Sequence, residues 1–149
     1  MTELFQKFEA AKIRYLLVGG QAMRLFGLPR YSMDWDLLIP PRDETNFVRI
    51  NSTLEDELDL PLIPLGPKGE NFIQTYQTSL GLLQFHLGLP GVPAFNEAEK
   101  MAVIKTMPDG IPIKCLSGEH LLAAKLAANR PQDQIDIEFL QELKRLGKL

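Results

Sequence analysis

The chain has 149 residues, enough for one domain with its own core, so we expect a single domain over residues 1–149. Hydrophobic residues make up 45% and charged residues 23% of it, as in ordinary soluble proteins, and the net charge of -3 argues against a broad basic surface for nucleic acid. Cys115 is the only cysteine, which excludes an internal disulfide and a multi-cysteine zinc site.

The sequence shows no sign of a membrane protein. Glu3, Lys7 and Glu9 interrupt the apolar core that a signal peptide needs. No run approaches the roughly 18 apolar residues that span a bilayer. We therefore expect a cytoplasmic protein with no membrane partner.

The chain begins with a predicted helix, a strand and a second helix. Thr2 can cap the first helix, whose apolar residues recur at helical spacing. The apolar run at 15–18 predicts a buried strand, which ends in Gly19 and Gly20. Good helix formers follow at 21–26, so the two glycines are expected to form a turn between a strand and a helix.

The middle of the chain predicts further strands. Residues 34–39 form an apolar run that carries two acids, and Asp43 is expected to cap a helix after it. Residues 72–76 and 80–87 predict two more strands, and the Gly- and Pro-rich segment 88–93 predicts a loop.

The C-terminal part is predicted to be mainly helical. Residues 111–116 predict a strand that buries Cys115, and Ser117 is expected to cap a helix. A last helix is predicted from about residue 132, with an inner face of Ile135, Phe139, Leu140, Leu143 and Leu146. This order favours an α+β or α/β domain with a mixed β-sheet flanked by helices and with C-terminal helices.

Asp34 and Asp36 are the most informative residues. Side chains two apart on a strand point to the same face, so both carboxylates are expected to converge on one spot. Their neighbours are apolar, and buried carboxylates are costly unless they are paired or bound to a metal. A divalent metal site is one interpretation. Two exposed carboxylates, or a salt bridge to Arg30, are the others.

Gly19 and Gly20 are candidates for a phosphate-binding turn. Glycine lets backbone N–H groups approach a phosphate closely, and the turn lies between a strand and a helix. A glycine pair by itself more often marks an ordinary turn. Together with the two carboxylates, the pair predicts a site where a divalent metal bridges to a nucleotide.

These features occur in a fixed order: Val18-Gly19-Gly20-Gln21-Ala22, then Gly27, then Arg30-x-Ser32-x-Asp34-x-Asp36 with an apolar tail. The combination resembles the nucleotidyltransferase superfamily, whose members share a hydrophobic-Gly-Gly/Ser turn followed by a strand carrying Asp-x-Asp. The Arg-x-Ser/Thr-x-Asp-x-Asp version is similar to minimal and toxin-type nucleotidyltransferases, some of which belong to toxin–antitoxin pairs. The later segments 116–125 and 130–136 look like that group's second motif, a Ser-capped helix with a lysine followed by Arg-x-x-Asp-x-x-Asp.

The resemblance implies a nucleotidyltransferase-like fold and a reaction. Mg²⁺ would bridge Asp34 and Asp36 to a nucleoside triphosphate, an acceptor hydroxyl would attack the α-phosphorus, and pyrophosphate would leave. The resemblance places Gly19 and Gly20 at the phosphates. It also makes Ser32, Arg30 and Lys125 nucleotide-binding candidates, although Lys125 at the edge of the core, and Asp133 and Asp136 as simple helix N-terminal charges, have structural interpretations too.

The chain departs from the family at one position. Active members carry a third acid on a later strand, and the matching residue is Gln84, which is a poor metal ligand and cannot act as a general base. His86, two residues on and on the same strand face, is the candidate base. A histidine satisfied by a neighbouring side chain is the simpler interpretation.

Three functions are therefore open. The leading one is a Mg²⁺-dependent nucleotidyltransferase whose acceptor is an RNA, a protein or a small molecule, with an antitoxin partner or a homodimer supplying acceptor recognition. The second is a catalytically impaired relative that binds a nucleotide or a partner protein. The third is a structural α+β domain in which the motif from Arg30 to Asp36 is a coincidence.

Overall fold

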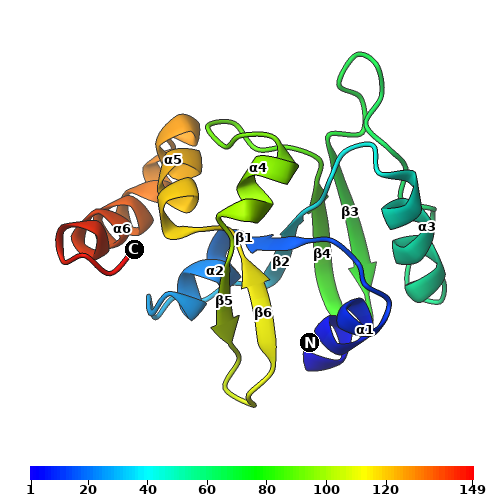
Figure 1. Cartoon of the computed structure of the whole chain (residues 1–149), viewed down its shortest axis with the longest axis horizontal. Helices are drawn as coiled ribbons and strands as arrows, with labels where there is room; N and C mark the ends of the chain where they lie inside the picture. The colour runs from blue at the N-terminus through cyan, green and yellow to red at the C-terminus, as the bar shows by residue number, and fades with distance from the viewer.

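The computed structural model describes residues 1–149 and contains a six-stranded mixed sheet flanked by helices (Figure 1). The elements in chain order are α1 (Thr2–Ala10), β1 (Leu16–Val18), α2 (Gly19–Leu25), β2 (Asp34–Leu38), α3 (Glu44–Thr53), β3 (Ile73–Thr78), β4 (Gly81–His86), α4 (Phe95–Lys100), β5 (Val103–Thr106), β6 (Pro112–Cys115), α5 (Gly118–Ala128), a 3₁₀ turn (Pro131–Asp133) and α6 (Gln134–Arg145). The predicted α+β class with a mixed sheet and C-terminal helices is confirmed.

The strands are ordered β3-β4-β2-β1-β6-β5. β2 lies in the middle, antiparallel to β1 and parallel to β4. The helices α5 and α6 lie together at one end of the molecule, and α1 and α3 lie at the other (Figure 1). β1 is buried on both faces because helices and neighbouring strands surround it, which explains its uniformly apolar sequence.

The predicted caps are confirmed at α3 and α5 and not at α1. The Asp43 side chain accepts a hydrogen bond from the Asn46 N–H, and the Ser117 side chain accepts one from the His120 N–H. Thr2 instead lies inside α1, which begins after Met1. The buried thiol predicted at Cys115 is present, and its burial raises its pKa to about 12.

Two further expectations are corrected. The short edge strand β5, whose residues alternate between half-buried and exposed, was not predicted, because four residues carry little periodicity. α2 begins at Gly19, so the glycines form the first turn of the helix.

The inner face of α6 is also rotated from the predicted one. Asp136, Ile137 and Leu140 are buried, while Ile135 is 69% exposed and Leu146 is 49% exposed. The Asp136 carboxylate takes one of the inward positions and pairs there with two cations described below. The inward face of this helix therefore combines apolar residues with a paired carboxylate.

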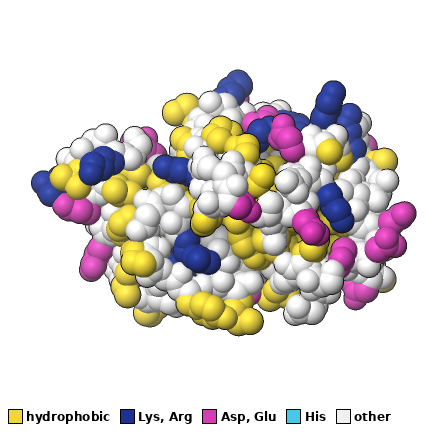
Figure 2. Space-filling view, turned by 90° about the horizontal axis from the view of Figure 1, so that it is seen from below, with side chains coloured by type: hydrophobic (Ala, Val, Ile, Leu, Met, Phe, Trp, Pro, Cys, Tyr) yellow, Lys and Arg dark blue, Asp and Glu magenta, His cyan; other side chains and the backbone are white.

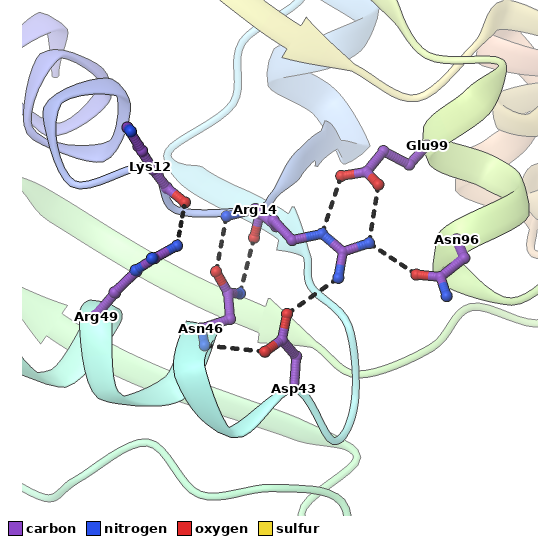
Figure 3. A network of polar contacts seen from close by, with 7 residues as sticks. All are labelled: Lys12, Arg14, Asp43, Asn46, Arg49, Asn96 and Glu99. Carbon is purple, nitrogen blue, oxygen red and sulfur yellow. Dashed lines mark hydrogen bonds and ion pairs between the residues drawn. The ribbon is translucent and has the colours of Figure 1, made fainter.

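A polar network around Arg14 joins β1 to α3 and α4 (Figure 3). The Arg14 guanidinium donates to Asp43 on one side and to Glu99 and Asn96 on the other. The buried Asn46 side chain accepts from the Arg14 backbone N–H at 2.7 Å and donates to its carbonyl at 3.0 Å. The Asn46 side chain thereby bonds the Arg14 backbone groups just before β1, as a neighbouring strand would do.

Asn46→Ala is expected to lower the free energy of unfolding by about 2 kcal/mol, because it leaves two backbone groups of Arg14 without partners. Urea denaturation measures the loss. Asn96→Ala is the control, since it removes only an exposed acceptor from the same network and is expected to change stability by no more than about 0.5 kcal/mol. Equal losses would contradict the role given to Asn46.

Candidate active site

The structure brings the residues predicted to bind metal, phosphate or nucleotide, together with the candidate base His86, into the lining of one cleft. The cleft has a volume of about 520 Å³ and opens over the middle of the sheet, beside α5. Its lining includes Gly19, Gly20, Arg30, Ser32, Asp34, Asp36, Gln84, His86 and Lys125. These residues come from β1–α2, β2, β4 and α5, so only the tertiary fold unites them.

The two glycines are required by close approach to the acidic strand. Gly19 has a φ of +71°, and a Cβ at this position would collide with the Asp36 carboxylate. A Cβ on Gly20 would lie 2.8 Å from the Ser32 Oγ. Because any larger residue would push β2 away, the glycines hold the backbone of α2 directly against Asp36.

Gln21 supports the wall of the cleft, a role that the sequence pattern did not predict. Its side chain is almost fully buried and its Nε2 donates to the Ser32 carbonyl at 2.8 Å. The Ser32 hydroxyl in turn donates to the Asp34 carbonyl at 3.3 Å. Gln21 therefore ties α2 to the segment that leads into β2. The sequence feature that could have indicated this role is a polar residue directly after a glycine pair in an apolar segment.

The register of β2 and β4 explains the position of Gln84. Asp36 is directly opposite Gln84, and Asp34 is opposite Leu82, on neighbouring parallel strands. Directly opposite residues project to the same face of a sheet, so Gln84 stands beside Asp36 in the cleft. A carboxylate at position 84 would complete a cluster of three acids, and this chain has an amide there.

His86 is bonded to one of the two carboxylates. Its Nε2 lies 2.8 Å from Asp36 Oδ1, so an ionised Asp36 accepts a hydrogen bond from it. The Nδ1 atom is buried and has no partner. The geometry matches a histidine satisfied by its neighbour. Because Nε2 already faces Asp36, His86 holds that carboxylate, and its role as a base stays a prediction.

The opposite wall of the cleft is built on two buried carboxylates. Asp133 and Asp136 have side chains only 1% exposed, and three cations surround them. Lys125 Nζ lies 3.0 Å from Asp136 and 3.4 Å from Asp133, and Arg130 bonds Asp133 with two nitrogens. Both acids lie at the N-terminus of α6, as the sequence predicted, and in addition they are buried and paired with cations.

Arg30 belongs to the same network. It donates to Asp136 and has no bond to Asp34, so the predicted alternative of a salt bridge to the Asp34 carboxylate is wrong. The acid that attracts it comes from α6, far along the chain. Three cations, Arg30, Lys125 and Arg130, face two carboxylates, so this wall carries one excess positive charge opposite Asp34 and Asp36.

The donor set suits Mg²⁺ bound jointly with phosphates. Asp34 and Asp36 offer hard carboxylate oxygens at the bottom of the cleft. No group of three or more His, Cys, Asp or Glu side chains is arranged to hold a metal, which argues against a closed site made of protein alone. Mg²⁺ is commonly held by one or two carboxylates, with waters and substrate phosphates completing its shell, and these residues fit that mode.

Gly19→Ala is expected to lower the free energy of unfolding by about 3 kcal/mol, the sum of left-handed strain and overpacking against Asp36. Gly110→Ala is the matched control, because Gly110 also has a positive φ and no atom lies near its missing Cβ. It should cost about 1 kcal/mol. Chemical denaturation of both variants measures the difference in their free energies of unfolding. Equal losses of stability would show that the Asp36 side chain can move aside without an energetic cost.

Asp133 predicts an acid-dependent loss of stability. The hydrogen bonds from Arg130, aided by the Lys125 charge, lower the Asp133 pKa from its ordinary value of 3.8 to about 2. A lowered pKa stabilises the fold above the unfolded value, and this stabilisation is lost as pH falls through the folded value. The stability advantage of wild type over Asp133→Asn is therefore expected to shrink by about 2 kcal/mol between about pH 5 and pH 2.

Urea denaturation at several pH values measures this advantage. Asp59→Asn, which removes an exposed carboxylate, is the control and is expected to follow the wild-type pH dependence. A constant difference between wild type and Asp133→Asn would contradict the lowered pKa.

Comparison with known proteins supports the fold. No protein-family model matches the sequence, and no curated protein matches it. Among solved structures, a nucleotidyltransferase-like antigenic protein from Paracoccidioides brasiliensis aligns with a TM-score of 0.57 at 20% identity, over 95% of this chain and 73% of its own. A provisionally named nucleotidyltransferase from Thermotoga maritima aligns with a TM-score of 0.56 at 12% identity, over 94% and 89% of the two chains. The chain thus has the fold of nucleotidyltransferase-like proteins.

Proposed function

We propose that the protein is a minimal, toxin-type nucleotidyltransferase that binds a nucleoside triphosphate with Mg²⁺ and transfers its nucleotidyl group to an acceptor hydroxyl. The observation that carries this proposal is the convergence of Asp34 and Asp36 with a glycine turn in one cleft. The fold is that of nucleotidyltransferase-like proteins, and none of the helices is long and apolar enough to cross a membrane.

Each wall of the cleft has a part in this proposal. Asp34 and Asp36 would hold Mg²⁺, which supplies charge neutralisation at the transferring phosphate when bound. The backbone N–H groups of Gly19 and Gly20, with the Ser32 hydroxyl, would contact the phosphates. The excess positive charge beside Lys125 would attract the triphosphate, and the lysine would act through its ion pairs rather than as a free cation.

A second function is favoured by one observation. Gln84 occupies the place beside Asp36 where a third acid would stand, and the His86 Nε2 that lines the cleft is already bonded to Asp36. A site with two carboxylates would still bind a metal–nucleotide complex while transferring slowly. A nucleotide- or partner-binding protein is therefore the alternative, with an antitoxin or a second copy of the chain as the partner.

Calorimetric titration with each nucleoside triphosphate, with and without Mg²⁺, tests the proposal. Wild type is expected to bind only with Mg²⁺, and Asp34→Asn combined with Asp36→Asn is expected to weaken binding at least about tenfold by removing the metal ligands. Asp56→Asn combined with Asp59→Asn is the control, because it removes the same charge from an exposed segment. Metal-independent binding, or binding that survives the first pair of changes, would overturn the site.

Pyrophosphate release separates the two functions. Gln84→Glu restores a carboxylate of the same length beside Asp36 and is expected to raise the rate at least about tenfold if the protein is an enzyme. Gln77→Glu on the neighbouring strand is the control. If wild type and Gln84→Glu bind the nucleotide but release no pyrophosphate, the binding function replaces the enzyme.

A further inference from the structure

A second hollow lies next to the cleft, at the carboxyl ends of β2 and β4. It has a volume of about 370 Å³, within the range of sites for small molecules, and none of its lining residues is charged. Leu38 and Ile39 form its base, Leu87 and Phe95 its sides, and Phe72 its rim. We call it the apolar groove.

The apolar groove and the cleft lie side by side. Phe72, Leu89 and Pro90 line both of them. Phe72 is 37% exposed, which leaves an aromatic side chain at the junction available to a ligand. A molecule lying in the apolar groove would therefore have its nearer end at the edge of the cleft that contains Asp36.

The walls of the apolar groove are held in place by close packing. Gly91 has a φ of +84°, and a Cβ on it would lie 2.6 Å from the Ala123 carbonyl oxygen of α5, so the loop is pressed against that helix. Phe95 lies under the Arg14 guanidinium, whose carbon is 5.1 Å from the ring centroid. Arg14 is itself fixed by the network of Figure 3. The hollow is thus formed in advance of any ligand.

If the proposed function holds, the direction in which the pyrophosphate leaves determines which substrate can occupy the apolar groove. In phosphoryl transfer the attacking and leaving oxygens lie on opposite sides of the phosphorus. From Asp36, the phosphate-binding glycines lie toward β1 and the start of β2, since Val18 is opposite Asp36. The apolar groove lies the other way, toward β4 and the end of β2. The pyrophosphate would leave toward the glycines, so the acceptor would approach from the side on which the apolar groove lies.

We propose that the acceptor is a small molecule whose hydroxyl is carried on an uncharged, apolar body, and that the apolar groove binds this body. The hydroxyl oxygen would bond to the α-phosphorus while the bond from that phosphorus to the bridging oxygen breaks. Pyrophosphate leaves with the electron pair, and the hydroxyl proton goes to solvent.

The charge of the surface favours this class of acceptor over RNA. A polynucleotide is bound mainly through its phosphates by lysine and arginine. The apolar groove contains neither residue, and on the face shown in Figure 2 the basic side chains are dispersed among acidic ones. The net charge of -3 points the same way.

The probe for the test is 2-naphthol, an uncharged fluorescent molecule with one hydroxyl, and its 6-sulfonate is the charged control. Wild type is expected to bind 2-naphthol saturably and to bind the sulfonate at least about tenfold more weakly, because a charge is costly among apolar side chains. Val92→Asp, which puts a carboxylate in the apolar groove, is expected to weaken 2-naphthol binding at least about tenfold. Val48→Asp, at an exposed site on α3, should not.

A second variant guards against misfolding. Ala94 lines the apolar groove and is the N-cap of α4, where it makes no side-chain cap. Ala94→Asp adds a favourable cap and a charge at the rim, so it is expected to fold at least as stably as wild type and still to weaken 2-naphthol binding.

Transfer from a nucleoside triphosphate labelled at the α-phosphate completes the test. The inference is supported if wild type transfers the label to 2-naphthol and both groove variants lose this transfer while they still bind the Mg²⁺–nucleotide complex. Three results would overturn the inference and leave the proposed function standing. Wild type would not bind 2-naphthol, or its binding would be unchanged by Val92→Asp and Ala94→Asp, or the label would be transferred instead to tRNA or to protein. No Mg²⁺–nucleotide binding by folded wild type overturns the proposed function, and the acceptor assignment with it.

Discussion

The cleft depends on one buried carboxylate, Asp136 of α6. It bonds Arg30, which precedes β2, and Lys125 of α5, so it connects the sheet to both C-terminal helices. A carboxylate that is 1% exposed is unfavourable without such partners, and each cation in turn is placed by the acid. The pairing therefore fixes the geometry of the cleft more than it adds to stability. On the same helix, Ile135 faces solvent.

The opposite wall is set by contact between backbone and side chain. Val18 is paired with Asp36, and the chain continues directly into the two glycines. The absence of side chains at Gly19 and Gly20 allows α2 to lie against the Asp36 carboxylate and the Ser32 hydroxyl. Gln21 then secures the segment before β2 from the helix side. The cleft is thus surrounded by the two carboxylates of β2, the backbone of the glycine turn, and the wall that contains Arg30, Lys125 and Arg130.

The substitution at position 84 has a consequence for the balance of charge. With Gln84 beside Asp36, the floor carries two carboxylates, and His86 bonds one of them. A metal that binds Asp36 must share that carboxylate with the histidine. The fold is common to nucleotidyltransferase-like proteins, while the amide and the histidine are properties of this chain that bear on how fast any transfer proceeds.

The sequence by itself determined the local features of this protein. The strand followed by two glycines, the two acids on one strand face, the caps at Asp43 and Ser117 and the buried Cys115 all follow from periodicity and residue chemistry within a few positions. The mixed sheet followed from the order of these elements, and the candidate site from motifs whose members lie close in the chain.

Only the tertiary structure decided which distant groups meet. The partner of Arg30 is 106 positions away, and the partner of Asp36 is 50 positions away. The inward face of α6 includes the paired Asp136 as well as apolar residues, and the apolar groove is lined by residues from three parts of the chain. Local patterns record the preference of a segment for a helix or a strand. They do not record the long-range pairing that satisfies a buried charge, because any of several acids in the sequence can serve the same cation until the fold selects one.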